Sequence, residues 1–215
     1  MNKNSKIDYL IPATGIFIGL PLLFWALGDF PRRTVLKESI SILFILSFSL
    51  MLGQFFLGRG NRSIVKRFKM GTVLRYHKVI AYSIVGVFLV HPFLIVVPRY
   101  FESGVTPMEA FITIITTFDS LGVVLGLIAW TLMLLLGITS FIRKRLPLKY
   151  ITWRYFHGIF SILFISFATF HVIDLGRHTN LAMSVYMIIL AVSGVVLLLI
   201  TYSKVPDKLE RRAND

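Results

Sequence analysis

Cysteine is absent from this 215-residue chain, and charged residues make up only 15% of it. The absence of cysteine excludes disulfides, iron–sulfur clusters held by thiolates, and covalent haem attachment through a C-x-x-C-H motif. The shortage of charge, set against 56% hydrophobic residues, lies outside the range of ordinary soluble domains. A lipid bilayer is therefore the expected solvent for most of the chain.

Six apolar runs have the length needed to cross a bilayer core, which takes about 20 residues of helix. The first run contains Pro12 and Pro21 and has no clear small-residue cleavage site before Asp29, so we interpret it as a membrane anchor. These patterns predict an all-α integral membrane protein, a six-transmembrane-helix bundle forming a single domain over residues 1–215. The expected spans are 9–27, 38–57, 78–98, 120–141, 155–174 and 181–202.

Positive charge is unevenly distributed along the chain. Lysine and arginine number 23 against 10 acidic residues, and 18 of them lie near the two ends or in segments 59–78 and 143–154. Because short cytoplasmic loops are enriched in these residues, both termini and these two segments are expected to be cytoplasmic. The net charge of +13 then reflects topology and attraction to anionic lipid or an acidic partner, and no nucleic-acid partner is expected.

Four of the five histidines fall in two of the expected spans. His77 and His91 are 14 residues apart, and so are His157 and His171. On an α-helix this interval is close to whole turns and rises about 21 Å, so each helix carries two histidines on one face, one in each leaflet. The two helices run in the same direction, which places His77 level with His157 near the cytoplasm and His91 level with His171 near the exterior.

Two level histidine pairs inside a membrane indicate a function, because ionisable groups are costly there. Low-spin haem iron takes one imidazole on each face, so we expect two b-type haems, an inner one on His77 and His157 and an outer one on His91 and His171. The same helix faces carry residues that could leave room for a flat ring or simply pack the helices: Ala81, Ile84, Phe88, Ser161, Phe164 and Ala168.

Basic residues flank the inner pair. Arg75, Lys78 and Arg154 could bind haem propionates through charge-assisted hydrogen bonds, and positive-inside topology alone explains them equally well. The fifth histidine, His178, lies in the polar outer segment 174–180 and is interpreted as a surface residue. A role for His178 near the outer haem edge, with Arg177, is the alternative.

The motifs around these histidines resemble the ferric reductase-type transmembrane family. They comprise H-K-x-x-x-Y from His77, the interval to His91, and Y-x-x-W-R-x-x-H, followed by His171; the second motif is formed by Tyr150, Trp153, Arg154 and His157. That family includes NADPH oxidases, ferric reductases and the haem subunit of the bacterial methionine sulfoxide reductase system. The resemblance implies a multi-pass protein of the cell membrane, of the bacterial inner or plasma membrane type.

The resemblance also implies a direction of electron flow, with entry at the inner haem and exit from the outer haem to an external acceptor. The chain has no G-x-G-x-x-G dinucleotide fingerprint, so the expected electron source is a separate reductase that brings FMN or FAD, or a quinol. The chain would then be the haem-bearing membrane subunit of an oxidoreductase, with no catalytic residue assigned. Its oligomeric state is left open.

Two other functions are compatible with the sequence. A quinol-oxidising cytochrome b subunit of a respiratory complex shares the paired spacing of histidines and would carry a polar quinone pocket near one haem. A membrane transporter or structural protein with packing histidines would bind no haem. A reduced-minus-oxidised spectrum separates the haem proteins from the transporter.

Overall fold

The computed structural model describes residues 4–31, 33–58, 60–101, 104, 106–118 and 120–203. Within them, regular secondary structure is entirely helical, and six segments are long and apolar enough to cross a membrane. The predicted all-α bundle with six spanning helices is therefore confirmed. The α-helices are α1 (Asn4–Thr14), α2 (Leu20–Ala26), α3 (Val35–Gly53), α4 (Arg62–Phe68), α5 (Met70–Val96), α6 (Pro107–Thr116), α7 (Leu121–Phe141), α8 (Tyr150–Leu175) and α9 (Leu181–Ser203).

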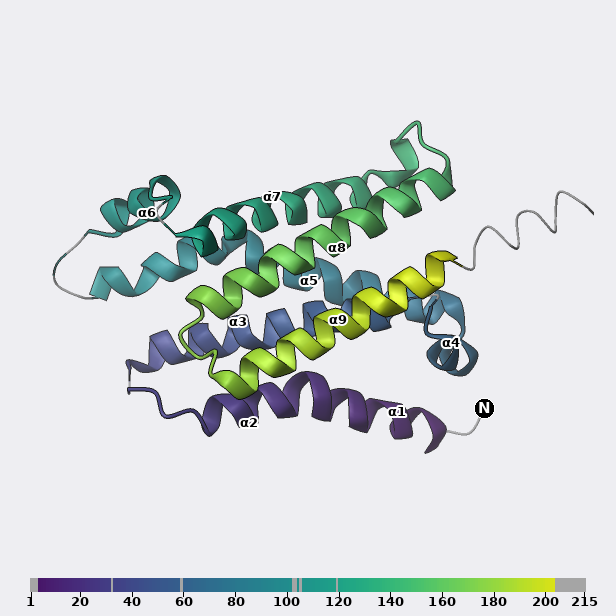
Figure 1. Cartoon of the computed structure of the whole chain (residues 1–215), viewed down its shortest axis with the longest axis horizontal. Helices are drawn as coiled ribbons and strands as arrows, with labels where there is room; N and C mark the ends of the chain where they lie inside the picture. The colour runs from purple at the N-terminus through teal and green to yellow at the C-terminus, as the bar shows by residue number, and fades with distance from the viewer. Residues whose placement is uncertain are drawn as a thin grey trace, which may run out of the picture.

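The long helices run side by side along the long axis of the molecule (Figure 1). One end, which we call the basic end, holds α4, the loop 142–149 between α7 and α8, and the last turn of α9. The opposite end holds the connections 27–34 and 176–180, together with α6. The start of α1 also lies at the basic end, as expected for an even number of crossings.

The histidine-bearing helices α5 and α8 are joined mainly through α7. Helix α7 packs along α8 and also contacts α5, whereas α5 and α8 are not among the described helix pairs in extensive backbone contact. Both helices begin earlier than expected, at Met70 and Tyr150 rather than at 78 and 155. Hydropathy alone misses these first turns because basic side chains at a membrane interface can direct their charges to water without ending the helix.

The first span is a helix interrupted by the π-helical segment Gly15–Gly19, which joins α1 to α2. Pro21 has no backbone N–H, so the carbonyl of Phe17 four residues earlier lacks its usual donor. The buried Ser49 hydroxyl of α3 donates to that carbonyl at 2.8 Å. Tyr186 of α9 donates to the neighbouring Ile16 carbonyl at 2.9 Å, and these bonds tie three helices together where water is absent.

Helix α6 lies in the segment expected to be an outer loop. Thr106 begins it with a capping box: its hydroxyl accepts from the Glu109 backbone N–H, and the Glu109 carboxylate accepts from the Thr106 backbone N–H at 2.9 Å. The Thr106 backbone N–H, together with the Thr106 hydroxyl, which also donates to the carboxylate at 2.8 Å, lowers the pKa of the Glu109 carboxyl. The T-P-x-E sequence is a helix start signal. Phe111 of α6 stacks on Phe93 of α5 at 5.0 Å between ring centres.

The interior of the bundle is small, and much of the apolar surface faces outward. The fully buried core includes Leu52 of α3, Ile165 of α8, and Met183 and Met187 of α9. By contrast, Leu181 of α9 is 81% exposed. Exposed apolar side chains of this kind are suited to lipid, which supplies the apolar surroundings that a water-soluble protein would have to build internally.

Candidate functional site

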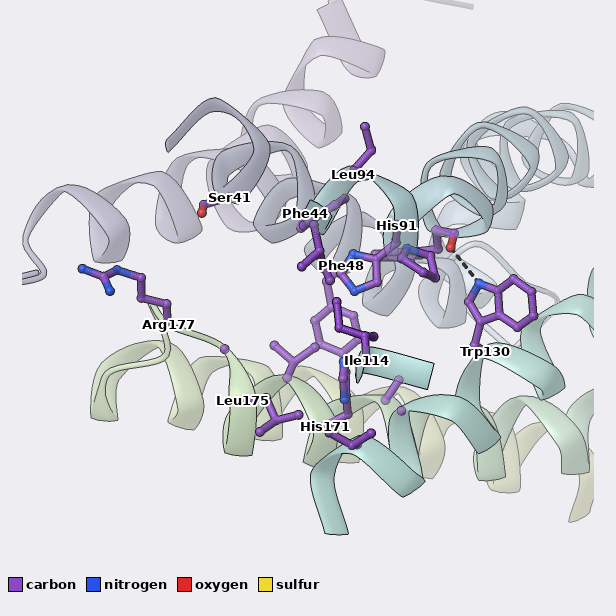
Figure 2. A pocket seen from close by; sticks show the side chains of 18 of the residues that line it. Ser41, Phe44, Phe48, His91, Leu94, Ile114, Trp130, His171, Leu175 and Arg177 are labelled. Carbon is purple, nitrogen blue, oxygen red and sulfur yellow. Dashed lines mark hydrogen bonds between the residues drawn. The ribbon is translucent and has the colours of Figure 1, made fainter. Parts of the chain in front are cut away.

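His91 of α5 and His171 of α8 point toward one another across a cavity (Figure 2). Their ring centres are 6.5 Å apart and their planes make an angle of 86°. A metal–imidazole bond is about 2 Å long, so two such bonds in line put the ring centres roughly 6 Å apart. The two imidazoles thus already stand at the separation that one metal atom between them requires.

The orientation of His171 is set by α7. Its Nδ1 lies 2.8 Å from the backbone carbonyl oxygen of Gly122, so Nδ1 carries the proton and donates it to that carbonyl. This arrangement leaves Nε2 as the nitrogen with a free lone pair. The hydrogen bond therefore selects the tautomer that a metal ligand needs.

Two glycines of α7 allow this close approach. A Cβ added at Gly126 would lie 2.3 Å from Nδ1 of His171, and one added at Gly122 would lie 2.2 Å from a carboxylate oxygen of Asp174. Glycines four residues apart lie on one face of a helix and let a neighbouring helix come near. The G-x-x-x-G spacing is visible in the sequence, but sequence reasoning did not connect it to the histidines.

The cavity between the two histidines has a volume of about 860 Å³ and is walled mainly by apolar side chains of α3, α5, α7 and α8. The centres of the Phe44 and His91 rings are 4.3 Å apart. Three of the residues predicted to leave room for a flat ring line the cavity, while a fourth, Ile84, is buried in the core. Those three are Phe88, Phe164 and Ala168.

Pro92 directly follows His91 inside α5. Because proline has no N–H, the Phe88 carbonyl one turn earlier loses its helical donor. Trp130 of α7 replaces it, with its indole Nε1–H donating to that carbonyl at 2.9 Å, the dashed line in Figure 2. This bond links the backbone next to His91 to α7, the same helix that orients His171.

The cavity extends to the end of the bundle opposite the basic end, where its lining becomes polar. Arg33, Lys37, Arg177 and His178 all contribute to this part of the lining. The Arg177 guanidinium also donates to the Pro31 carbonyl at 3.1 Å, which holds the loop after α8 against the loop before α3.

His178 is buried, and its interpretation as a surface residue was wrong. Its side chain is 5% exposed, and its Nε2 lies 3.2 Å from the Glu38 carboxylate. The centres of the His178 and Phe30 rings are 4.7 Å apart. Burial lowers the pKa of His178 from its ordinary value, while the Glu38 carboxylate acts in the opposite direction. The residues that surround His178 are far from it in the sequence, so no pattern near position 178 predicts its burial.

The inner histidines have different surroundings. Nδ1 of His157 on α8 is 3.4 Å from the Ser140 hydroxyl of α7. The indole of Trp153, one turn before His157, stacks on the imidazole with ring centres 5.1 Å apart and planes 25° apart. Ser161, one turn after His157, donates to the His157 carbonyl at 2.6 Å.

The basic residues predicted to flank the inner pair are placed as follows. Arg75 and Lys78 are exposed on α5. The Arg154 guanidinium lies over the Tyr202 ring of α9, 5.0 Å from its centre, and the Arg154 carbonyl accepts from the Tyr202 hydroxyl. A different arginine, Arg143, lies over the Trp153 ring at 5.1 Å; its position at the end of α7, separate in sequence from the histidine helices, kept it out of the predicted set.

The described residues contain no cluster of three or more histidine, cysteine or acidic side chains that could hold a bare metal ion. Each histidine pair could therefore supply at most two ligands and not a complete coordination sphere. A planar macrocycle that brings four ligands of its own fits a two-imidazole site.

Comparison with known proteins places this arrangement in context. The family described as ferric reductase like transmembrane component matches residues 43–168, a stretch that includes His77, His91 and His157 and ends three residues before His171. An uncharacterized protein of Archaeoglobus fulgidus is 43% identical over 158 residues, which cover 74% of this chain and 86% of that protein. No solved structure matches the chain.

Proposed function

Since the chain belongs to the ferric reductase like transmembrane component family, we propose that it carries electrons across a membrane through two b-type haems. His91 and His171 would hold the outer haem, and His77 and His157 the inner one. The observation that carries the proposal is the facing pair of imidazoles at 6.5 Å across a cavity. We further propose that residues 1–215 act as a single domain.

The residues around the outer pair suit a haem. A b-type haem is a flat apolar ring with two carboxylates, and the cavity joins apolar walls to a polar end lined by Arg33 and Arg177. Nδ1 of His91 is buried and has no hydrogen-bond partner among the described residues, so no hydrogen bond at that atom competes with a ligand role for the ring. When bound, the haem supplies an iron that exchanges one electron at a time.

The chain's own residues have three tasks in this function. The Gly122 carbonyl keeps the proton of His171 on Nδ1, and Trp130 holds the backbone beside His91 through the Phe88 carbonyl. The aromatic side chains that line the cavity exclude water, which lowers the reorganisation needed for charge movement. Neutral imidazoles suit both redox states of a haem iron without any proton release.

The proposed direction follows from charge. We place the basic end at the cytoplasm, because the loops there carry most of the lysine and arginine, and both termini with it. A separate reductase or flavoprotein with an acidic surface would be attracted there, and a quinol is the other candidate donor. The acceptor would meet the opposite end, to which the cavity extends.

A spectrum tests the proposal. The protein is purified in detergent from haem-replete cells, and its dithionite-reduced spectrum is compared with the oxidised one. We expect a b-type α-band and two haems per chain by pyridine haemochrome assay. Absence of any b-type band from folded protein would overturn the proposal and favour a transporter or structural role.

A further inference from the structure

A column of stacked groups leads from the loop after α7 to His157. The rings of Tyr150 and Trp153 are 6.2 Å apart with planes 25° apart, and Trp153 stacks in turn on His157. The Arg143 guanidinium carbon lies 4.6 Å from the centre of the Tyr150 ring and 5.1 Å from that of Trp153. A cation and an indole are thus fixed together beside a proposed haem ligand.

Two donors in this column have no acceptor. Nε of Arg143 and Nε1 of Trp153 are both buried, and neither has a hydrogen-bond partner among the described residues. In the other two tryptophans of the chain, the indole Nε1–H has an acceptor. Trp130 donates to the Phe88 carbonyl, and Trp25 donates to the Glu38 carboxylate. Leaving a buried donor without an acceptor is unfavourable, so two such donors close together point to an acceptor that the described residues do not supply.

The chemistry of the two donors indicates that their acceptor is an anionic group with oxygen atoms. A guanidinium prefers carboxylate or phosphate, and an indole N–H donates without accepting. Trp153 lies one helical turn before His157, on the side of the basic end. The carboxylates of an amphiphilic haem in this leaflet would point the same way, toward water and away from the bilayer centre.

We propose that Arg143 and Trp153 form the carboxylate-binding site of the inner haem. The inference rests on the proposed function and goes beyond it, because the arginines and lysine first considered for this role have other surroundings: Arg75 and Lys78 are exposed, and Arg154 covers Tyr202. The stack holds Arg143 in place, and the buried position strengthens a charge-assisted hydrogen bond.

The test measures haem release from a protein that holds the inner haem alone. In a His171→Ala background, excess apomyoglobin captures haem as it dissociates, and the rate is read from the absorbance of myoglobin. We expect Arg143→Gln to release haem about tenfold faster than the background protein. Trp153→Phe keeps an aromatic ring at this position and removes the N–H, and we expect a rate about threefold faster. Arg145→Gln, an exposed arginine of the same loop, is the matched control and should leave the rate unchanged.

Haem dimethyl ester makes the test specific for the carboxylate. With this ester in place of haem, the background protein should release its ligand quickly, and Arg143→Gln should accelerate release no further. Unchanged haem release in both Arg143→Gln and Trp153→Phe would overturn the assignment, as would equal acceleration of haem and ester release by Arg143→Gln. If the His171→Ala protein is folded yet holds no haem, the proposed function fails at its inner ligand pair, a result distinct from either of these.

Discussion

His91 and His171 face each other across a cavity with one imidazole oriented by a backbone carbonyl. His157, nearer the basic end, stacks instead on the Trp153 indole, and the Arg143 guanidinium lies over that indole. The same two helices, α5 and α8, carry both pairs. The difference therefore comes from what packs around them: glycines of α7 at the outer level, and aromatic and cationic side chains at the inner level. Outer ligation should depend on close helix approach, and inner ligation on the stack.

Gly126→Ala should have the largest effect of the variants considered, and this effect should be confined to the His91–His171 pair. The added Cβ would lie 2.3 Å from Nδ1 of His171, closer than atoms tolerate, so the imidazole must leave its position. We expect loss of the outer haem with retention of the inner one, read as one haem per chain. Gly86→Ala on α5 is the matched control, because a Cβ there meets nothing within 4 Å, and this variant should keep two haems.

Trp130→Phe probes the link between α7 and the backbone beside His91. It removes the donor to the Phe88 carbonyl and should destabilise the protein by about 1–3 kcal/mol, measured by unfolding in mixed detergent. In a Pro92→Ala background, the N–H at position 92 can serve that carbonyl. Trp130→Phe should then cost clearly less, and an equal cost in both backgrounds would show that the carbonyl is not the reason.

His178 should make the stability of the folded protein decrease at acidic pH. This effect should be smaller than those of the two preceding variants. Burial lowers the pKa of His178 in the folded state, so the unfolded chain binds a proton more readily. Its contribution to stability is complete above the ordinary histidine pKa of about 6.5 and declines as pH falls from there toward the lowered value. Thermal unfolding from pH 7.5 to 5 should show this decline, and His178→Asn should reduce it. Removing the opposing charge in Glu38→Gln should steepen it.

Thr106→Ala should have the smallest effect. It removes the hydroxyl that caps α6 and should cost about 1 kcal/mol, seen as faster hydrogen exchange in α6. Because Thr113 and Ile114 of α6 line the outer cavity, loosening should reach that level of the bundle. Exchange near His157 should stay unchanged, and a change there would show that the two levels are mechanically connected.

The spans and the facing outer histidines could be predicted because they follow from features local to one segment. Apolar length determines which segments cross a bilayer, and an interval of 14 residues places His77 and His91 on one helix face whatever surrounds them. Even the capped helix at Thr106 had a readable start signal, which the prediction of an outer loop overlooked.

The remaining features depend on contacts between distant segments. His178 is polar in a polar stretch, and only the fold brings Glu38 and Phe30 around it. Arg143 is one of several basic residues after α7, and nothing in the sequence separates it from its exposed neighbour Arg145. Gly126 matters because α8 happens to bring His171 against it, a pairing that one sequence without its structure does not show.

The pairing of histidines by level is tested by the haem content of the four single histidine-to-alanine variants, combined with a redox titration of each. We expect His91→Ala and His171→Ala to retain the same single haem, with one midpoint potential. His77→Ala and His157→Ala should retain the other haem, with a different potential. Loss of both haems from any folded single variant, or one shared potential across all four, would contradict the assignment of level histidine pairs.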